Sequence, residues 1–218
     1  MNGHSEGRKE CPPLMFDGKE QTMAIGKRVL ILLWACAPLL FTLGCTGVGK
    51  VEQGRVIAFD QQKGLVTVIR DSGTNKPQYD VLPPFTVKTP SNPDEMGPAP
   101  AAGKRLLFDT NSKKIVFFDV VSGTIKTVTY TPLMEAANVS KDDPRVKDIR
   151  FPAIDRQNKA ITIYSSRDRK LVKFTLADEY FALPDDTWQA GDDVRYYFKQ
   201  PGQALRMMNV SKTDVMKG

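Results

Sequence analysis

Two stretches of this chain, about 90 residues apart, carry similar residues in the same order, and this repeat limits the fold more than any other feature. Residues 58–69, Ala-Phe-Asp-Gln-Gln-Lys-Gly-Leu-Val-Thr-Val-Ile, align with residues 153–164, Ala-Ile-Asp-Arg-Gln-Asn-Lys-Ala-Ile-Thr-Ile-Tyr. Later matches keep the order: Phe85-Thr86 with Phe174-Thr175, Pro93-Asp94 with Pro184-Asp185, and Ala102-Gly103 with Ala190-Gly191. The sequence therefore predicts two copies of one structural unit.

Each copy reads as short β-strands separated by turn residues, and no amphipathic helix longer than about two turns is evident. The strands are expected at 55–59, 65–69, 79–88, 105–108 and 114–120, and then at 149–154, 160–165, 171–176, 194–198 and 205–210. Pro83 and Pro84 mark an edge strand or a bulge, because proline cannot donate to a strand ladder. Small five-stranded units usually close, since open sheets leave unpaired edges.

We therefore predict an all-β fold of two tandem, duplicated five-stranded small barrels, OB-like or SH3-like, after an N-terminal signal helix. The expected barrels are residues 54–125 and 148–212, joined by a linker at 126–147 and followed by a tail at 213–218. Within the linker, residues 133–139 are expected to form a short helical turn.

A basic and then apolar segment precedes the repeats. Lys27 and Arg28 lead into an apolar run at 29–43, and Gly44 precedes Cys45, which is the order of parts in an export signal. The run is shorter than the roughly 20 residues of a membrane-spanning helix. We predict a signal peptide at 23–44 and a tether at 45–53, and we interpret residues 1–22, which fit no export signal, as an untranslated or disordered extension.

The ending Leu43-Gly44-Cys45 resembles the lipobox of bacterial lipoproteins, in which the cysteine sulfur receives a diacylglyceryl group and a peptidase cuts just before that cysteine. That family usually has leucine three residues before the cysteine, where this chain has Thr42. The alternative is a secretory peptide with an incidental cysteine. Because Thr46 rather than aspartate follows Cys45, the resemblance implies the periplasmic face of the outer membrane. The whole chain is similar to uncharacterised exported lipoproteins of sulfate-reducing bacteria, a domain of unknown function, which implies no activity.

The residues after the predicted cleavage site exclude several kinds of chemistry. The three cysteines are Cys11, Cys36 and Cys45, and the single histidine is His4. A mature chain of this kind lacks the residues for the usual zinc or copper sites, a Ser-His-Asp triad or a Cys-His pair. We therefore predict a non-enzymatic protein without cofactor or metal.

Carboxylates recur at the expected turns, and we interpret them as turn residues whose side chains bond their own backbone. The alternative function is a carboxylate-dependent envelope hydrolase, which would need two carboxylates in one cleft.

The charge and the aromatic residues indicate what the protein binds. Lys and Arg number 31 against 25 Asp and Glu, but no block of like charges marks a nucleic-acid arm, so no nucleic-acid partner is expected. The expected partners are the bilayer, through acylated Cys45, and an envelope protein or glycan. Aromatics near arginines can form a binding surface, although core packing is the alternative. The predicted binding residues are Tyr180, Phe181, Trp188, Arg167 and Arg169.

Overall fold

The computed structural model describes residues 48–213, which belong to a compact unit beginning at Gly47. The expected signal helix, Cys45 and residues 214–218 lie outside the described residues. Within 48–213 the chain forms twelve β-strands, and its helices are short 3-10 turns, which confirms the all-β prediction. None of the helices in this part has the length and hydropathy needed to cross a membrane. The 3-10 helices are η3 (Pro93–Glu95), η4 (Asp178–Ala182) and η5 (Asp185–Thr187).

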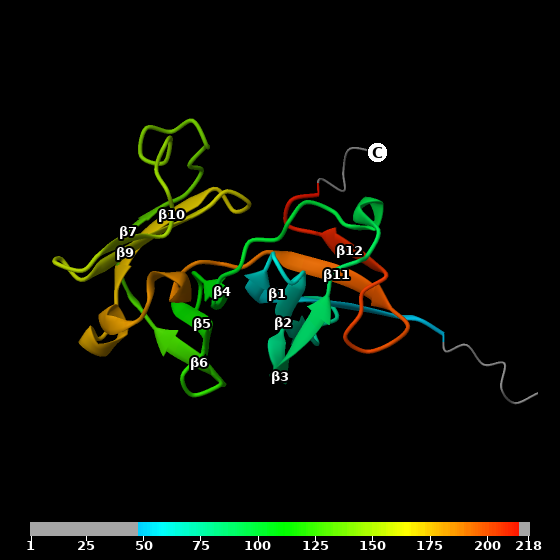
Figure 1. Cartoon of the computed structure of the whole chain (residues 1–218). Helices are drawn as coiled ribbons and strands as arrows, with labels where there is room; N and C mark the ends of the chain where they lie inside the picture. The colour runs from blue at the N-terminus through cyan, green and yellow to red at the C-terminus, as the bar shows by residue number, and fades with distance from the viewer. Residues whose placement is uncertain (1–47, 214–218) are drawn as a thin grey trace, which may run out of the picture. The chain divides into compact units, whose positions relative to one another are not determined.

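The largest sheet has five antiparallel strands in the order β12-β11-β1-β2-β3 (Figure 1). Its strands are β1 (Lys50–Asp60), β2 (Leu65–Asp71), β3 (Tyr79–Lys88), β11 (Asp193–Phe198) and β12 (Arg206–Asn209). Strand β3, which contains Pro83 and Pro84, lies at the edge of this sheet, as predicted.

Two smaller antiparallel sheets complete the fold, and all three sheets are open. The three-stranded sheet has the order β4-β5-β6, with β4 (Arg105–Asp109), β5 (Lys114–Asp119) and β6 (Thr124–Thr129). The four-stranded sheet has the order β7-β10-β9-β8, with β7 (Thr131–Ala136), β8 (Ala153–Asp155), β9 (Ala160–Ser165) and β10 (Lys170–Thr175).

The segment expected to be a linker is partly strand. β6 and β7 are separated only by Tyr130, so the chain passes from the three-stranded to the four-stranded sheet at this residue. The helical turn predicted at 133–139 is wrong, because β7 pairs with β10 there, with Glu135 opposite Val172. Pairing with β10 outweighs the local helix preference of this stretch.

The two largest clusters of buried residues lie on different sheets. The five-stranded sheet encloses nine buried residues, namely Val56, Val66, Val68, Val87, Val194, Tyr196, Phe198, Ala204 and Met207. The other core joins the two smaller sheets and includes Phe117, Tyr130, Phe174 and Trp188. A smaller cluster lies between the five-stranded and three-stranded sheets, so the five-stranded sheet buries apolar residues on both faces. Burial of apolar surface is the main stabilising term for an open sheet.

The strands of the two repeat copies are exchanged. The expected first unit would have kept β1–β5 together, and the expected second unit would have kept β8–β12 together. Instead, β11 from the second copy pairs with β1, with Val51 opposite Tyr197 and Gly54 opposite Val194, and β12 pairs with the other edge of β11 (Figure 1). Strands β4 and β5 from the first copy share a core with β9 and β10. The grouping of strands therefore differs from the tandem boundaries 54–125 and 148–212.

The exchange occurs where two glycine-containing segments run past each other. The amide of Gly103 donates to the carbonyl of Val56 at 3.1 Å, and the amide of Asp192 donates to the carbonyl of Ala101 at 2.9 Å. A Cβ on Gly191 would overlap the carbonyl oxygen of Val56, and a Cβ on Gly103 would overlap that of Gln189. Only glycine permits backbones to approach this closely. The matched Ala-Gly pairs of the repeat thus meet at the crossing.

Candidate functional site

One face of the five-stranded sheet is covered over only part of its area. Successive side chains of a strand point to opposite faces. Ile57 and Ile69, on the face opposite the nine-residue core, pack against Leu106 and Phe118 of the three-stranded sheet. Toward the start of β1 the same face carries Val51, which is 61% exposed. We call this face the outer face. Its uncovered part includes Val51, near the start of β1.

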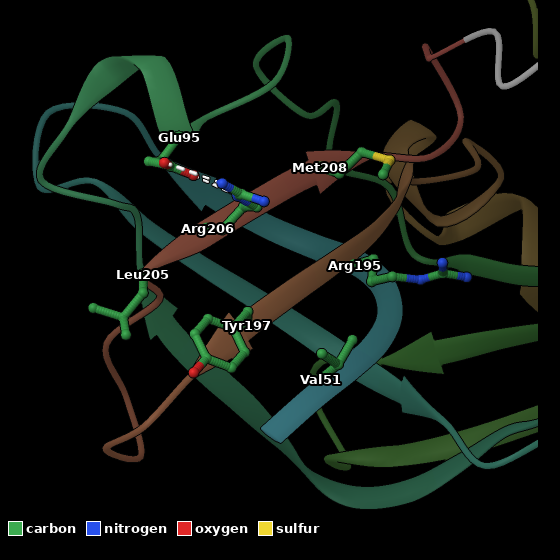
Figure 2. A pocket seen from close by; sticks show the side chains of 7 residues that line it. All are labelled: Val51, Glu95, Arg195, Tyr197, Leu205, Arg206 and Met208. Carbon is green, nitrogen blue, oxygen red and sulfur yellow. Dashed lines mark hydrogen bonds and ion pairs between the residues drawn. The ribbon is translucent and has the colours of Figure 1, made fainter. Parts of the chain in front are cut away.

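A hollow of about 570 Å³ lies on the uncovered part of the outer face (Figure 2). It is lined by Val51, Glu95, Arg195, Tyr197, Leu205, Arg206 and Met208. Figure 2 shows Arg195 and Tyr197 on β11, whereas the alternate residues Val194 and Tyr196 belong to the core. The apolar part of the hollow therefore follows from strand alternation, with Leu205 45% exposed beside it.

The charged rim of the hollow is only partly neutralised. Arg206 forms an ion pair with Glu95, and the hydrogen bond from Arg206 lowers the pKa of Glu95 below its usual range. Arg195 donates instead to the side-chain oxygen of Gln53, through Nε at 3.3 Å and Nη2 at 3.0 Å. No carboxylate pairs with Arg195 among residues 48–213. The hollow thus combines apolar surface with an uncompensated positive charge.

A second site begins at a partly buried ion pair. Arg55 donates to both carboxylate oxygens of Asp193, at 3.0 and 2.6 Å, and also to the carbonyl of Leu106 at 2.9 Å. The hydroxyl of Tyr79 donates to Asp193 at 2.6 Å, and Arg55 lies 4.8 Å from the centroid of the Tyr79 ring. These contacts link the five-stranded sheet to β4, and bidentate pairs of this kind are among the strongest polar contacts in proteins.

The protonation states in this cluster are well defined. Burial raises the pKa of Tyr79 far above its ordinary value, so its phenol remains neutral and can donate. Burial alone would lower the pKa of Arg55, but its hydrogen bonds and the charge of Asp193 raise the pKa above the usual value. Arg55 therefore remains protonated and pairs with Asp193.

Arg105 lies close to this cluster and is less well satisfied. Its Nε donates to the carbonyl of Trp188 at 2.8 Å, and its guanidinium lies 5.6 Å from the centroid of the Phe108 ring. Burial, together with the charge of Arg55, lowers the pKa of Arg105 to about 10. No carboxylate pairs with it within the described part of the chain. It is a half-buried cation without a counter-ion.

These residues open onto a cleft of about 570 Å³ between strands of all three sheets. The side chains that matter for its chemistry are Arg55, Tyr79, Arg105, Tyr164, Arg167 and Asp193. The hydroxyls of Tyr79 and Tyr164 donate within the protein, so the cleft presents to a ligand mainly the positive charges of Arg105 and Arg167.

The predicted binding residues are not gathered on one surface. Trp188 is fully buried and Phe181 is 8% exposed, because the 3-10 turns η4 and η5 fold them into the core between the smaller sheets. Tyr180 is half-buried against the same core, with its ring 6.4 Å from that of Phe117. Arg167 lines the cleft, and Arg169 is exposed in the β9–β10 turn. A role of these residues in binding stays a prediction, but Trp188 and Phe181 can act only through packing.

The turn carboxylates have structural partners. Asp60, Asp109, Asp119 and Asp155 each accept backbone N–H groups from their own hairpin turns. The three carboxylates that line the cleft are also engaged: Asp193 with Arg55, Asp192 with Lys212, and Asp168 with Ser165. No group of three or more His, Cys, Asp or Glu side chains within 48–213 is arranged to hold a metal ion. The geometry of these carboxylates favours turn and ion-pair roles.

Sequence reasoning missed the hollow and Arg105, and the reason is the strand exchange. Alternation along β11 could have shown that Arg195 and Tyr197 share a face. It could not have shown that β11 lies beside β1, or that Arg105 lies beside Trp188. Both sites depend on residues that are far apart in the sequence.

Comparisons with known proteins identify a family, but no individual relative and no solved structure. No curated protein matches this chain, and no solved structure matches it. A family model described as a domain of unknown function (DUF4881) matches residues 47–218, which is the part that contains all twelve strands. The chain therefore belongs to the DUF4881 family, whose domain comprises both the hollow and the cleft.

Proposed function

We propose that this protein is a membrane-anchored lipoprotein of the cell envelope, lipidated at Cys45, whose β modules bind an envelope partner. The basic and then apolar segment that ends at Cys45 supports the anchor. The envelope partner is a protein or glycan, and the location we propose is the periplasmic face of the outer membrane. The engaged carboxylates favour binding over the alternative, hydrolysis.

The observation that carries the proposal is the position of the hollow relative to the anchor. Val51, which lines the hollow, follows Cys45 by six residues. Six residues span at most about 20 Å even when fully extended. A lipid on Cys45 would therefore keep the hollow within about 20 Å of the bilayer.

The composition of the hollow suits the headgroup layer. Tyrosine is enriched where membranes meet water, because its ring is apolar and its hydroxyl is polar. Arginine near the surface is attracted to anionic headgroups. Tyr197 and Leu205 would contact the bilayer, and Arg195, which has no carboxylate partner in the described part, would contact headgroups. The cleft would remain available for a ligand.

Membrane fractionation tests the anchor. We expect Cys45→Ala to release the protein from the membrane fraction or to leave it as uncleaved precursor, because the thiol that receives the lipid is gone. Cys36→Ala is the matched control, since it removes a cysteine of the same apolar segment, and it should fractionate as the wild type does. If Cys45→Ala is processed and remains in the membrane fraction, the lipoprotein proposal is wrong.

Vesicle binding tests the hollow. In a chain that begins at Thr46, and so lacks both Cys45 and the apolar segment, we expect Leu205→Ser to reduce co-sedimentation with anionic phospholipid vesicles several-fold. The control is Val121→Ser, which removes an apolar side chain that is 96% exposed in the β5–β6 turn. Both side chains are exposed, so neither change should unfold the protein. Equal binding by the two variants would show that the hollow does not face the bilayer.

A further inference from the structure

Arg105 has hydrogen-bonding capacity that the protein does not use. A guanidinium has five N–H donors, and within residues 48–213 the Arg105 side chain makes one hydrogen bond, from Nε to the carbonyl of Trp188. Within 48–213, the fully enclosed side-chain atoms without a partner are Arg70 Nε and the hydroxyl oxygen of Tyr130. The two amino groups of Arg105 are not among them, so they are not completely enclosed, and Arg105 is one of the residues that line the cleft.

The charges around Arg105 do not neutralise it. Its neighbour Arg55 is a cation whose own charge is matched by Asp193. Asp192 lies 3.2 Å from Lys212 and accepts from the side-chain amide of Asn209, so it is also engaged. Arg167 adds a further positive charge to the cleft lining.

An uncompensated cation in a half-buried place costs free energy. Such a residue can be retained because a ligand completes its bonding. Arginine is well suited to this role, because its planar fork matches the two oxygens of a carboxylate or phosphate group.

We propose that the cleft binds a small ligand through an oxyanion group, a carboxylate or a phosphate, held by the amino groups of Arg105. A volume of about 570 Å³ is within the usual range for small-molecule sites. The hydroxyl of Ser165 is already bonded to Asp168, but Ser166, which lines the same cleft, can bond polar groups of the ligand. This inference rests on the binding function proposed above and specifies the chemistry of the ligand.

Calorimetric titration of the full chain in detergent tests the proposal, with inorganic phosphate and acetate as separate probes. We expect at least one anion to bind, and the preferred one identifies the ligand as a phosphate or a carboxylate. Arg105→Gln should weaken that binding at least tenfold, because it removes the charge and one arm of the fork. Arg150→Gln removes the same charge from an exposed position outside the cleft lining and should leave binding unchanged. The proposal is overturned if neither anion binds the wild type, or if Arg105→Gln binds as tightly.

Thermal melting separates a ligand role from a purely structural one. The anion found above should raise the melting temperature of the wild type but not that of Arg105→Met, because binding to the native state alone stabilises it. If the anion raises both melting temperatures equally, Arg105 does not hold it and the proposal fails. Neither result affects membrane fractionation of Cys45→Ala, so the failure of this inference can be distinguished from failure of the anchor.

Discussion

At the scale of residues, one residue with a positive φ closes each of five hairpin turns. Five hairpin turns of four residues end in a residue with positive φ: Gly64, Lys113, Gly123, Lys159 and Arg169. An aspartate or serine immediately precedes the four residues of each turn, and its side-chain oxygen forms a hydrogen bond within the turn. The left-handed conformation is strained for every residue except glycine. Three of the five turns therefore store strain in a lysine or an arginine.

We expect Lys113→Gly and Lys159→Gly each to increase the free energy of unfolding by about 0.5–1 kcal/mol, because glycine relieves the strain but loses more chain entropy. Gly123→Ala is the converse control. A Cβ at Gly123 would meet nothing within 4 Å, so Gly123→Ala destabilises the protein only through the positive φ of this residue. We expect the free energy of unfolding to fall by about 0.5–1 kcal/mol. Urea denaturation measures all three. A loss of stability in both lysine variants would contradict the shared turn geometry.

Two buried tyrosines differ in their hydroxyl groups. The hydroxyl of Tyr130 has no partner within the described residues, and burial raises its pKa to about 12. The hydroxyl of Tyr79 donates to Asp193 at 2.6 Å. The same substitution at these two positions should therefore have opposite effects.

We expect Tyr130→Phe to be neutral or to stabilise the fold by up to about 1 kcal/mol, since it removes an unpaired buried hydroxyl. Tyr79→Phe should destabilise by about 1.5–3 kcal/mol, because the lost bond is to a charged carboxylate. Equilibrium unfolding in urea at neutral pH compares the two variants. Equal losses of unfolding free energy in the two variants would show that the hydrogen bond from Tyr79 to Asp193 does not stabilise the fold.

At the scale of elements, the two Ala-Gly segments decide where the exchanged strands cross. Gly191 lies against the carbonyl of Val56, which itself accepts from the amide of Gly103. A methyl group on Gly191 would meet a backbone atom, the carbonyl oxygen of Val56. No flexible side chain can therefore move aside to make room for it. The crossing is thus sensitive to the smallest change in size.

We expect Gly191→Ala to destabilise the protein by about 2–3 kcal/mol, because an added methyl in tight packing forces the backbones apart. Gly97→Ala is the control, since its Cβ would come no closer than 3.2 Å to its nearest neighbour, the amide nitrogen of Asn209. The control should cost distinctly less in thermal or urea unfolding. A Gly191→Ala variant as stable as the wild type would exclude this close crossing.

At the scale of the whole molecule, the exchange makes neither predicted unit complete by itself. Five of the nine residues in the core of the five-stranded sheet come from the second copy: Val194, Tyr196, Phe198, Ala204 and Met207. Removing them exposes the other four and leaves one edge of β1 unpaired. Burial of apolar surface is the dominant favourable term in folding.

We therefore expect a chain that ends at residue 125 to be unfolded by circular dichroism and to lack a cooperative melting transition. The matched control is residues 47–218, which contains every described strand and should melt cooperatively. A cooperative transition in the shorter chain would contradict the pairing of β1 with β11.

The sequence by itself determined the all-β class, most strand positions, the β3 edge and the turn roles of the carboxylates. These features are local: alternation, proline without a donor, and aspartate that bonds its own turn all act within a few residues. The predicted hairpins at Asp60 and Asp155 accordingly have the same turn bonds.

Only the tertiary structure decided which strands pair and which aromatic residues are buried. A duplicated sequence offers β1 two similar partners, β4-β5 and β11-β12, and alternation is the same in either arrangement. The choice depends on the glycine crossing and on core packing between distant residues. Trp188 is buried, Tyr197 lines a hollow and Arg105 faces a cleft because of that choice, since each position depends on long-range contacts.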